Sequence, residues 1–127
     1  MAALRLLKDL VARNPLIVFS KTTCPYCQLV HSILVSDLGA GFAFKAKAEF
    51  VQLDTRDDGP EIQNALQEMT GSRTVPKVFI GGSLIGGCDD TRKLQENGKL
   101  IEILAKAGIQ MAKAARSPSV QGDKAKL

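Results

Sequence analysis

Apolar residues recur at helical spacing in several stretches of the chain. Leu4, Leu7 and Val11 open the sequence with this pattern. It ends before Asn14-Pro15, because the residue that precedes a proline disfavours helical geometry. A second helix is predicted to begin at Pro25, since proline favours the first helical position. Its expected apolar stripe consists of Leu29, Val30, Ile33 and Leu34.

Further helices are predicted in the second half of the chain. The stretch DDGPEIQNALQEMTG has acidic residues before its first turn and a glycine at its end, as helix termini favour. The apolar face expected there consists of Ile62, Ala65, Leu66 and Met69. From Asp89 onward, DDTRKLQENG and KLIEILAKAG predict two short helices, each ended by glycine.

The remaining apolar runs predict strands. LIVF (16–19) is typical of a strand buried on both faces, and EFVQLD (49–54) predicts a second strand. KVFI and SLIG flank Gly81-Gly82, the signature of a two-residue hairpin. A helix joins the first two strands, so they should run parallel, whereas the hairpin strands must be antiparallel. The sequence therefore predicts an α/β fold with one mixed, four-stranded sheet and helices on both of its faces.

Length and composition set the limits of this fold. A chain of 127 residues predicts one domain. We place it at residues 1–112, because periodicity is lost afterwards and residues 113–127 read as a disordered basic tail. Much of the net charge of +4 lies in this tail, a pattern more typical of a solvated end than of a nucleic-acid surface.

The cellular compartment of the protein is predicted from features that the sequence lacks. Its N-terminus has neither the basic start nor the long apolar stretch of a signal peptide, and no run approaches the roughly 20 apolar residues of a membrane span. The 3 cysteines are too few for a secreted disulfide framework. We therefore expect a reduced, cytoplasmic protein that binds neither nucleic acid nor a membrane.

The stretch KTTCPYC carries the candidate chemistry. Cys24 falls at the N-cap of the second predicted helix, and Cys27 falls one turn inside it, so the two sulfurs can meet. The unpaired N–H groups of the first turn, the helix dipole and Lys21 all favour a thiolate at Cys24. Cys24 is therefore the predicted nucleophile, and the more buried Cys27 is the candidate resolving thiol.

The cysteine pair could also serve a metal site or a structural bridge. A zinc site needs four ligands, and Cys24, Cys27, Cys88 and His31 could supply them. A structural disulfide is a second alternative, disfavoured in a cytosolic chain. A strand, a CxxC motif and a helix in succession favour a redox centre over both. His31 is expected to be an ordinary residue of the helix surface.

The chain resembles the dithiol glutaredoxins of the thioredoxin fold across roughly residues 3–110. Three segments carry the resemblance: KTTCPYC, EIQNALQEMTGSRTVPKVFIGGSLIGGCDD and LQENGKL. CPYC alone is moderately specific, but the TVP that follows it and the GGCDD beyond make the match highly specific. Thioredoxins match less well, because their motif resembles WCGPC and this chain has no Trp.

The resemblance implies a glutathione site. In the family pattern, Lys21 and Gln63 hold the glycine carboxylate of the ligand, and Tyr26 lies where it can contact substrate. The resemblance also implies a cis peptide bond before Pro76 that turns the backbone of Val75 toward the ligand. Thr74 belongs to the same segment. The γ-glutamyl end would be received by Gly87, Cys88, Asp89 and Asp90.

The function implied is glutathione-dependent reduction of protein–glutathione mixed disulfides and protein disulfides. Glutathione would be the co-substrate, glutathione reductase an indirect partner, and no metal is expected. The protein is expected to act as a monomer. Two alternatives remain: an iron–sulfur carrier that shares a cluster through Cys24 and glutathione, and a thioredoxin-type reductase that depends on Cys27. The final Ala-Lys-Leu resembles a peroxisomal address, which would give a second location.

Overall fold

The computed structural model describes residues 2–37 and 48–109. The predicted domain boundary at residue 112, the basic tail 113–127 and the GAGFAFKAK connector (39–47) fall wholly or mostly outside this part of the chain. None of the described helices is both long and apolar enough to cross a lipid bilayer.

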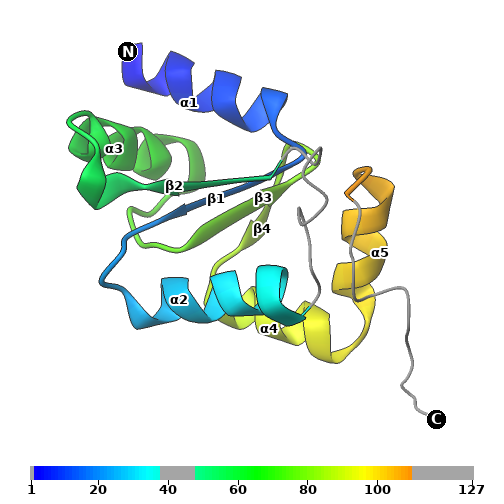
Figure 1. Cartoon of the computed structure of the whole chain (residues 1–127). Coiled ribbons are helices and arrows are strands. Elements are labelled where there is room, and N and C mark those ends of the chain that lie inside the picture. Colours follow the sequence, from blue (N-terminus) through cyan, green and yellow to red (C-terminus); the bar gives the residue numbers. More distant parts are fainter. Residues whose placement is uncertain (1, 38–47, 110–127) are drawn as a thin grey trace, which may run out of the picture.

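A four-stranded mixed sheet forms the centre of the structure, as predicted (Figure 1). Its strands are β1 (Leu16–Ser20), β2 (Ala48–Gln52), β3 (Lys77–Ile80) and β4 (Ser83–Gly86), in the order β2-β1-β3-β4. β1 runs parallel to β2 and antiparallel to β3, and β3 and β4 form an antiparallel hairpin. Gly81 and Gly82 make its turn at φ 61° and 83°, values that L-residues rarely adopt.

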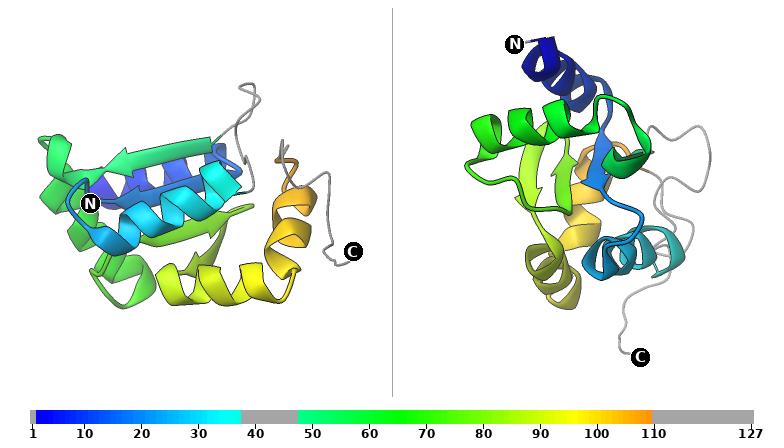
Figure 2. Two further views of the ribbon diagram at one scale, coloured as in Figure 1. Left: turned by 60° about the horizontal axis from the view of Figure 1, so that its bottom comes forward. Right: turned by 90° about the vertical axis from the view of Figure 1, so that its left-hand side faces the viewer.

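Helices cover both faces of this sheet. On one face lie α1 (Ala2–Arg13) and α3 (Gly59–Thr70), and on the other lie α2 (Pro25–His31) and α4 (Cys88–Glu96), as the views of Figure 2 agree. α5 (Lys99–Lys106) packs on the second face at one end of the sheet. The predicted layers are therefore confirmed.

The buried side chains form two clusters, one on each face of the sheet, and strand β1 contributes to both. Successive strand residues point to opposite faces, so Leu16 and Val18 join the cluster under α2, α4 and α5, whereas Ile17 and Phe19 join the cluster under α1 and α3. All its residues are buried, as the unbroken LIVF run predicted. This strand leads directly to the turn that carries Cys24.

Some local predictions were wrong. The predicted strand 49–54 ends earlier, because Leu53–Thr55 form a 3-10 turn, η2. The second helix changes into a π-helix, η1 (Ser32–Asp37), which the regular apolar spacing did not indicate. Leu29 and Met69 were assigned to apolar faces, yet both lie at the edge of the buried face of their helix. The exposed fraction is 38% for Leu29 and 37% for Met69.

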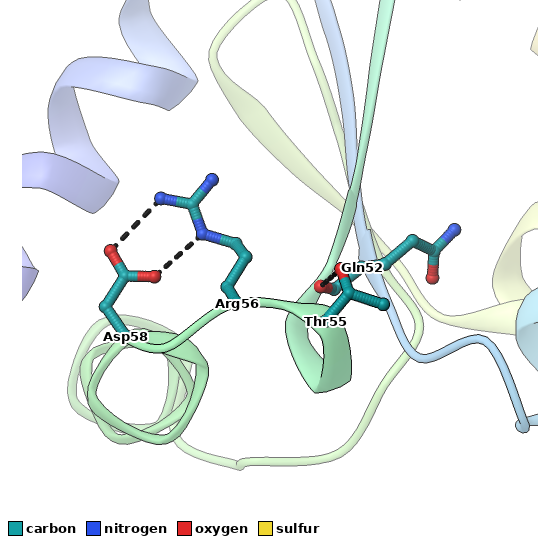
Figure 3. A network of polar contacts seen from close by, with 4 residues as sticks. All are labelled: Gln52, Thr55, Arg56 and Asp58. Atoms are coloured by element: carbon teal, nitrogen blue, oxygen red, sulfur yellow. Dashed lines mark hydrogen bonds and ion pairs between the residues drawn. The ribbon is translucent and has the colours of Figure 1, made fainter.

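A short surface network leads from β2 into α3 (Figure 3). Thr55 Oγ1 donates to the carbonyl of Gln52 at 2.9 Å. Arg56 makes two hydrogen bonds to the carboxylate of Asp58, the residue before α3, at 2.8 and 3.1 Å. Both side chains of this ion pair are over a third exposed, so it shapes the turn more than it stabilises the fold.

The aromatic pair in the core under α1 and α3 gives the first prediction. Phe79 meets Phe19 edge to face, with ring centroids 5.8 Å apart. Phe79→Ala should leave a cavity and lower the free energy of unfolding by about 3–5 kcal/mol in urea denaturation. Met69→Ala, which removes an exposed side chain, should change it by less than about 1 kcal/mol. Equal effects of the two changes would contradict this description of the core.

Candidate functional site

The turn between β1 and α2 presents the first cysteine. Cys24 is the N-cap of α2, with extended backbone geometry, and Pro25 is the first helical residue, as predicted. The Cys24 N–H donates back to the Lys21 carbonyl at 3.2 Å, and its own carbonyl accepts the Gln28 N–H at 3.1 Å. The Cys24 side chain therefore lies at the free N–H end of the helix.

Asp54 fixes this turn from η2, the 3-10 turn that directly follows the neighbouring strand β2. Its carboxylate oxygens accept the Thr22 N–H at 3.0 and 3.2 Å and the Thr22 hydroxyl at 2.5 Å. The Thr22 carbonyl in turn accepts the Gln28 side-chain amide at 3.0 Å. These hydrogen bonds to Thr22 hold the pKa of Asp54 below its usual range. Sequence reasoning missed Asp54, although parallel β1 and β2 necessarily end at the same edge of the sheet.

The surroundings of Cys24 favour its thiolate. Partial burial alone would raise the pKa of Cys24, but hydrogen bonds from Cys27 and from the backbone of Tyr26, with the charge of Lys21, outweigh it. The net result is a Cys24 pKa below the ordinary thiol value. This is the direction predicted from the helix N-terminus.

Cys27 has the opposite character. It is buried, and that burial raises its pKa to about 12, together with the hydrogen bond and negative charge of Cys24. All three cysteines, Cys24, Cys27 and Cys88, are free thiols in the structure. The pair therefore consists of one partly exposed thiol with a lowered pKa and one buried thiol with a raised pKa, within hydrogen-bond reach of each other.

A cavity of about 510 Å³ adjoins this pair. Most of the predicted ligand-contacting residues line it: Tyr26, Thr74, Val75, Pro76, Gly87, Cys88, Asp89 and Asp90. The Val75–Pro76 peptide bond is cis, as the resemblance implied. Cys88, which lines this cavity, lies close enough to Cys24 to be influenced by its charge.

The N-terminus of α4 forms one wall of the cavity. Asp90 accepts the Gly87 N–H at 3.2 Å and so closes the first turn. A side chain on Gly86, whose φ is 130°, would collide with Asp90. Asp89 is exposed, and its carboxylate has no hydrogen-bond partner within residues 2–37 and 48–109, which leaves it available. Burial raises the pKa of the Cys88 thiol in this wall.

Lys21 and Gln63 do not line this cavity. Lys21 is half-buried beside a smaller cavity of about 240 Å³, which Cys27 and His31 also line. Gln63 donates its amide to the Arg73 carbonyl at 2.7 Å, and Arg73 donates to Asn64. In this structure Gln63 therefore binds the backbone of the loop that leads to Thr74.

The cavity also contains residues that sequence reasoning did not select: Thr70, Ser72, Lys77, Leu84 and Gly86. Lys77 is a charged residue at the start of the apolar run KVFI, and this contrast was the signal that could have identified it. His31 is exposed, and its ring lies 4.7 Å from that of Phe50, as expected for a helix-surface residue. In the described part of the chain, no three His, Cys, Asp or Glu side chains are arranged to hold a metal ion.

Comparison with known proteins identifies the family. A sequence model of the family described as Glutaredoxin matches residues 16–85, more than half of the chain. "Glutaredoxin-C2" of Arabidopsis thaliana is 50% identical over 113 residues, which cover 89% of this chain and 96% of that protein. "Glutaredoxin" of Solanum lycopersicum is 54% identical over 101 residues, 80% of this chain and 87% of that protein.

A solved structure agrees with these relatives. The crystal structure of a buckwheat glutaredoxin–glutathione complex superposes with a TM-score of 0.75 at 46% identity, covering 84% of this chain and 91% of that one. The chain therefore belongs to the glutaredoxin family of thiol–disulfide oxidoreductases.

Proposed function

We propose that this protein reduces protein–glutathione mixed disulfides with glutathione as the second substrate, and that Cys24 is the nucleophile. The observation that carries the proposal is the contrast between the two thiols: Cys24 is partly exposed with a lowered pKa, and Cys27 is buried with a raised one. The cavity beside them has the size and polar groups for a small peptide.

The groups around the cavity suit the charges of glutathione. The backbone N–H and C=O of Val75 have no hydrogen-bond partner among the described residues, so they can pair with an extended peptide. N–H groups at the start of α4 suit the γ-glutamyl carboxylate, and Asp89 suits its amine. Lys21 and Gln63 would hold the glycine carboxylate if they turn toward the ligand. The glutathione complex of the buckwheat relative supports this ligand.

The reaction consists of two thiol–disulfide exchanges. The Cys24 thiolate attacks the glutathione sulfur of the mixed disulfide, and the target protein leaves as a thiolate that takes up a proton. Cys24 then carries the glutathione. A second glutathione, as its thiolate, attacks that sulfur, releases glutathione disulfide and restores the Cys24 thiolate. The net reaction converts the mixed disulfide and one glutathione into the free protein thiol and glutathione disulfide, which a glutathione reductase system would reduce again.

Cys27 would act on protein disulfides. In the resting enzyme, the hydrogen bond and charge of Cys24 help to keep Cys27 protonated. Once Cys24 is bound in a mixed disulfide its charge is gone, and both of these influences disappear. Burial, the largest cause of the raised pKa of Cys27, remains, but without these two influences its pKa is lower, which favours attack by Cys27 when an intermediate has to be resolved.

Location and partners form part of the same proposal. We propose a monomer that acts in the cytoplasm on glutathionylated and disulfide-containing proteins. The Ala-Lys-Leu end, which lies outside the described residues, gives a peroxisome-type organelle as the alternative. Fusing the last dozen or so residues to a fluorescent protein tests this, because targeting would give puncta and cytoplasmic residence a diffuse signal.

The catalytic assignment predicts unequal effects of removing each thiol. Cys24→Ser should reduce glutathione-dependent turnover of a glutathionylated peptide to the uncatalysed rate. Cys27→Ser should stay within a factor of about three of the wild type, since glutathione itself is the second thiol. If Cys27→Ser is also inactive, or glutathione supports no turnover, a thioredoxin-type mechanism replaces this one.

The lowered pKa of Cys24 predicts the pH dependence of the rate. The rate to measure is that of the first exchange, in Cys27→Ser with glutathionylated peptide and no free glutathione. Above the Cys24 pKa this rate should be flat, because Cys24 is a thiolate; below it, the rate should fall by about tenfold for each pH unit. Lys21→Met removes a positive charge that stabilises the thiolate. The fall of the rate toward low pH, the acid limb of the pH profile, should therefore begin at a higher pH in this variant. A matched Lys99→Met variant, changed on distant α5, should leave the limb in place. An acid limb that Lys21→Met leaves unmoved would contradict this electrostatic role.

A further inference from the structure

Lys77, the first residue of β3, has unusual surroundings for a lysine. Its side chain is buried, with 6% of the residue exposed. The ammonium donates to Ser72 Oγ at 2.8 Å, to the Thr74 carbonyl at 2.6 Å and to Thr74 Oγ1 at 2.9 Å. Within residues 2–37 and 48–109, no carboxylate forms an ion pair with it. The charge is therefore satisfied by neutral oxygen atoms alone.

Packing alone does not account for a lysine at this position. Moving an ammonium out of water is costly unless an anion accompanies it, and burial accordingly lowers the pKa of Lys77. The rest of β3, Val78–Ile80, is apolar and buried. Thr74 is exposed and could bond to water in place of Lys77. An unbranched apolar side chain would therefore serve the fold at least as well.

The bond to the Thr74 carbonyl fixes the direction of the neighbouring N–H group. The Thr74–Val75 peptide is trans, since the cis bond found in this segment is Val75–Pro76. In a trans peptide the C=O and the following N–H point to opposite sides. Because Lys77 holds the Thr74 oxygen on its own side, the Val75 N–H points away from the strand end. That N–H has no partner among the described residues.

We propose that Lys77 is a positioning residue that holds and polarises the Thr74–Val75 peptide, so that the Val75 N–H is ready to donate to bound glutathione. The inference rests on the proposed function, because it requires glutathione to pair with Val75. A hydrogen bond from an ammonium is charge-assisted, and it polarises the carbonyl that it reaches. Polarisation passes along the peptide and makes its N–H a stronger donor.

The test measures how stable the glutathione adduct of Cys24 is. In a Cys27→Ser background, Cys24 is equilibrated with reduced and oxidised glutathione, and the adduct is quantified by mass spectrometry. The same measurement with mercaptoethanol, which lacks peptide groups, gives the reference. Adding Lys77→Met should lower the preference for glutathione by about five- to tenfold, the effect of one ordinary hydrogen bond, and leave the mercaptoethanol equilibrium unchanged. Lys8→Met, on the surface of α1, removes the same charge and should leave both unchanged.

Thermal unfolding separates positioning from a structural role. Lys77→Met should melt at the same or a higher temperature, because a buried ammonium is removed. A lower melting temperature with an unchanged preference for glutathione would overturn the proposal. If the Cys27→Ser background itself shows no preference for glutathione over mercaptoethanol, the proposed function fails instead.

A second measurement needs no change at Lys77. In the ¹⁵N-labelled Cys27→Ser protein, the Val75 amide proton should move downfield when Cys24 is glutathionylated, as a newly hydrogen-bonded donor does. Modification with mercaptoethanol should leave it in place. A Val75 resonance that responds equally to both adducts would overturn the proposal, whether or not Lys77→Met folds.

Discussion

The contact between the Cys24 sulfur and the first N–H groups of α2 is the interaction on which the chemistry of this protein depends. An unpaired helix N-terminus favours negative charge, and here a cysteine occupies the capping position. Hydrogen bonds from Cys27 and Tyr26 outweigh the effect of burial and lower the pKa of Cys24. The same helix buries Cys27 one turn later and raises its pKa. One structural element thus gives two identical residues opposite reactivities.

The sheet holds the two loops that flank this helix end. At the end of β2, Asp54 binds the backbone and hydroxyl of Thr22 and fixes the turn that precedes Cys24. At the start of β3, Lys77 binds Ser72 and Thr74 and fixes the loop that carries Val75. Both charged residues are at strand ends next to β1, whose buried residues belong to both cores. The position of the cysteine pair relative to the cavity therefore depends on the buried strand at the centre of the sheet.

Much of this arrangement could be predicted, because it depends on short-range rules. The LIVF run, the Gly81-Gly82 turn and Pro25 after Cys24 each specify local geometry, and the structure confirms all three. The π-helical turn and the exposed rim position of Leu29 depend on how α2 rotates against the sheet, which apolar spacing does not determine.

The polar contacts of the site were harder to predict. Asp54 meets Thr22 across 32 positions of sequence, and Lys77 in isolation resembles an ordinary strand-end lysine. Most of the ligand-contacting residues came from the family resemblance, and the structure brings them together around one cavity. It places Lys21 and Gln63 outside that cavity.

Direct titration of the two active-site thiols tests the central claim most directly. With ¹³C-labelled cysteine β-carbons, NMR follows Cys24 and Cys27 separately in the reduced protein as the pH is raised. We predict that Cys24 ionises below the ordinary thiol value and that Cys27 stays protonated until the pH approaches about 12. If Cys27 ionises first, or both thiols titrate together at the ordinary value, the end of α2 does not control their reactivity and the central claim is wrong.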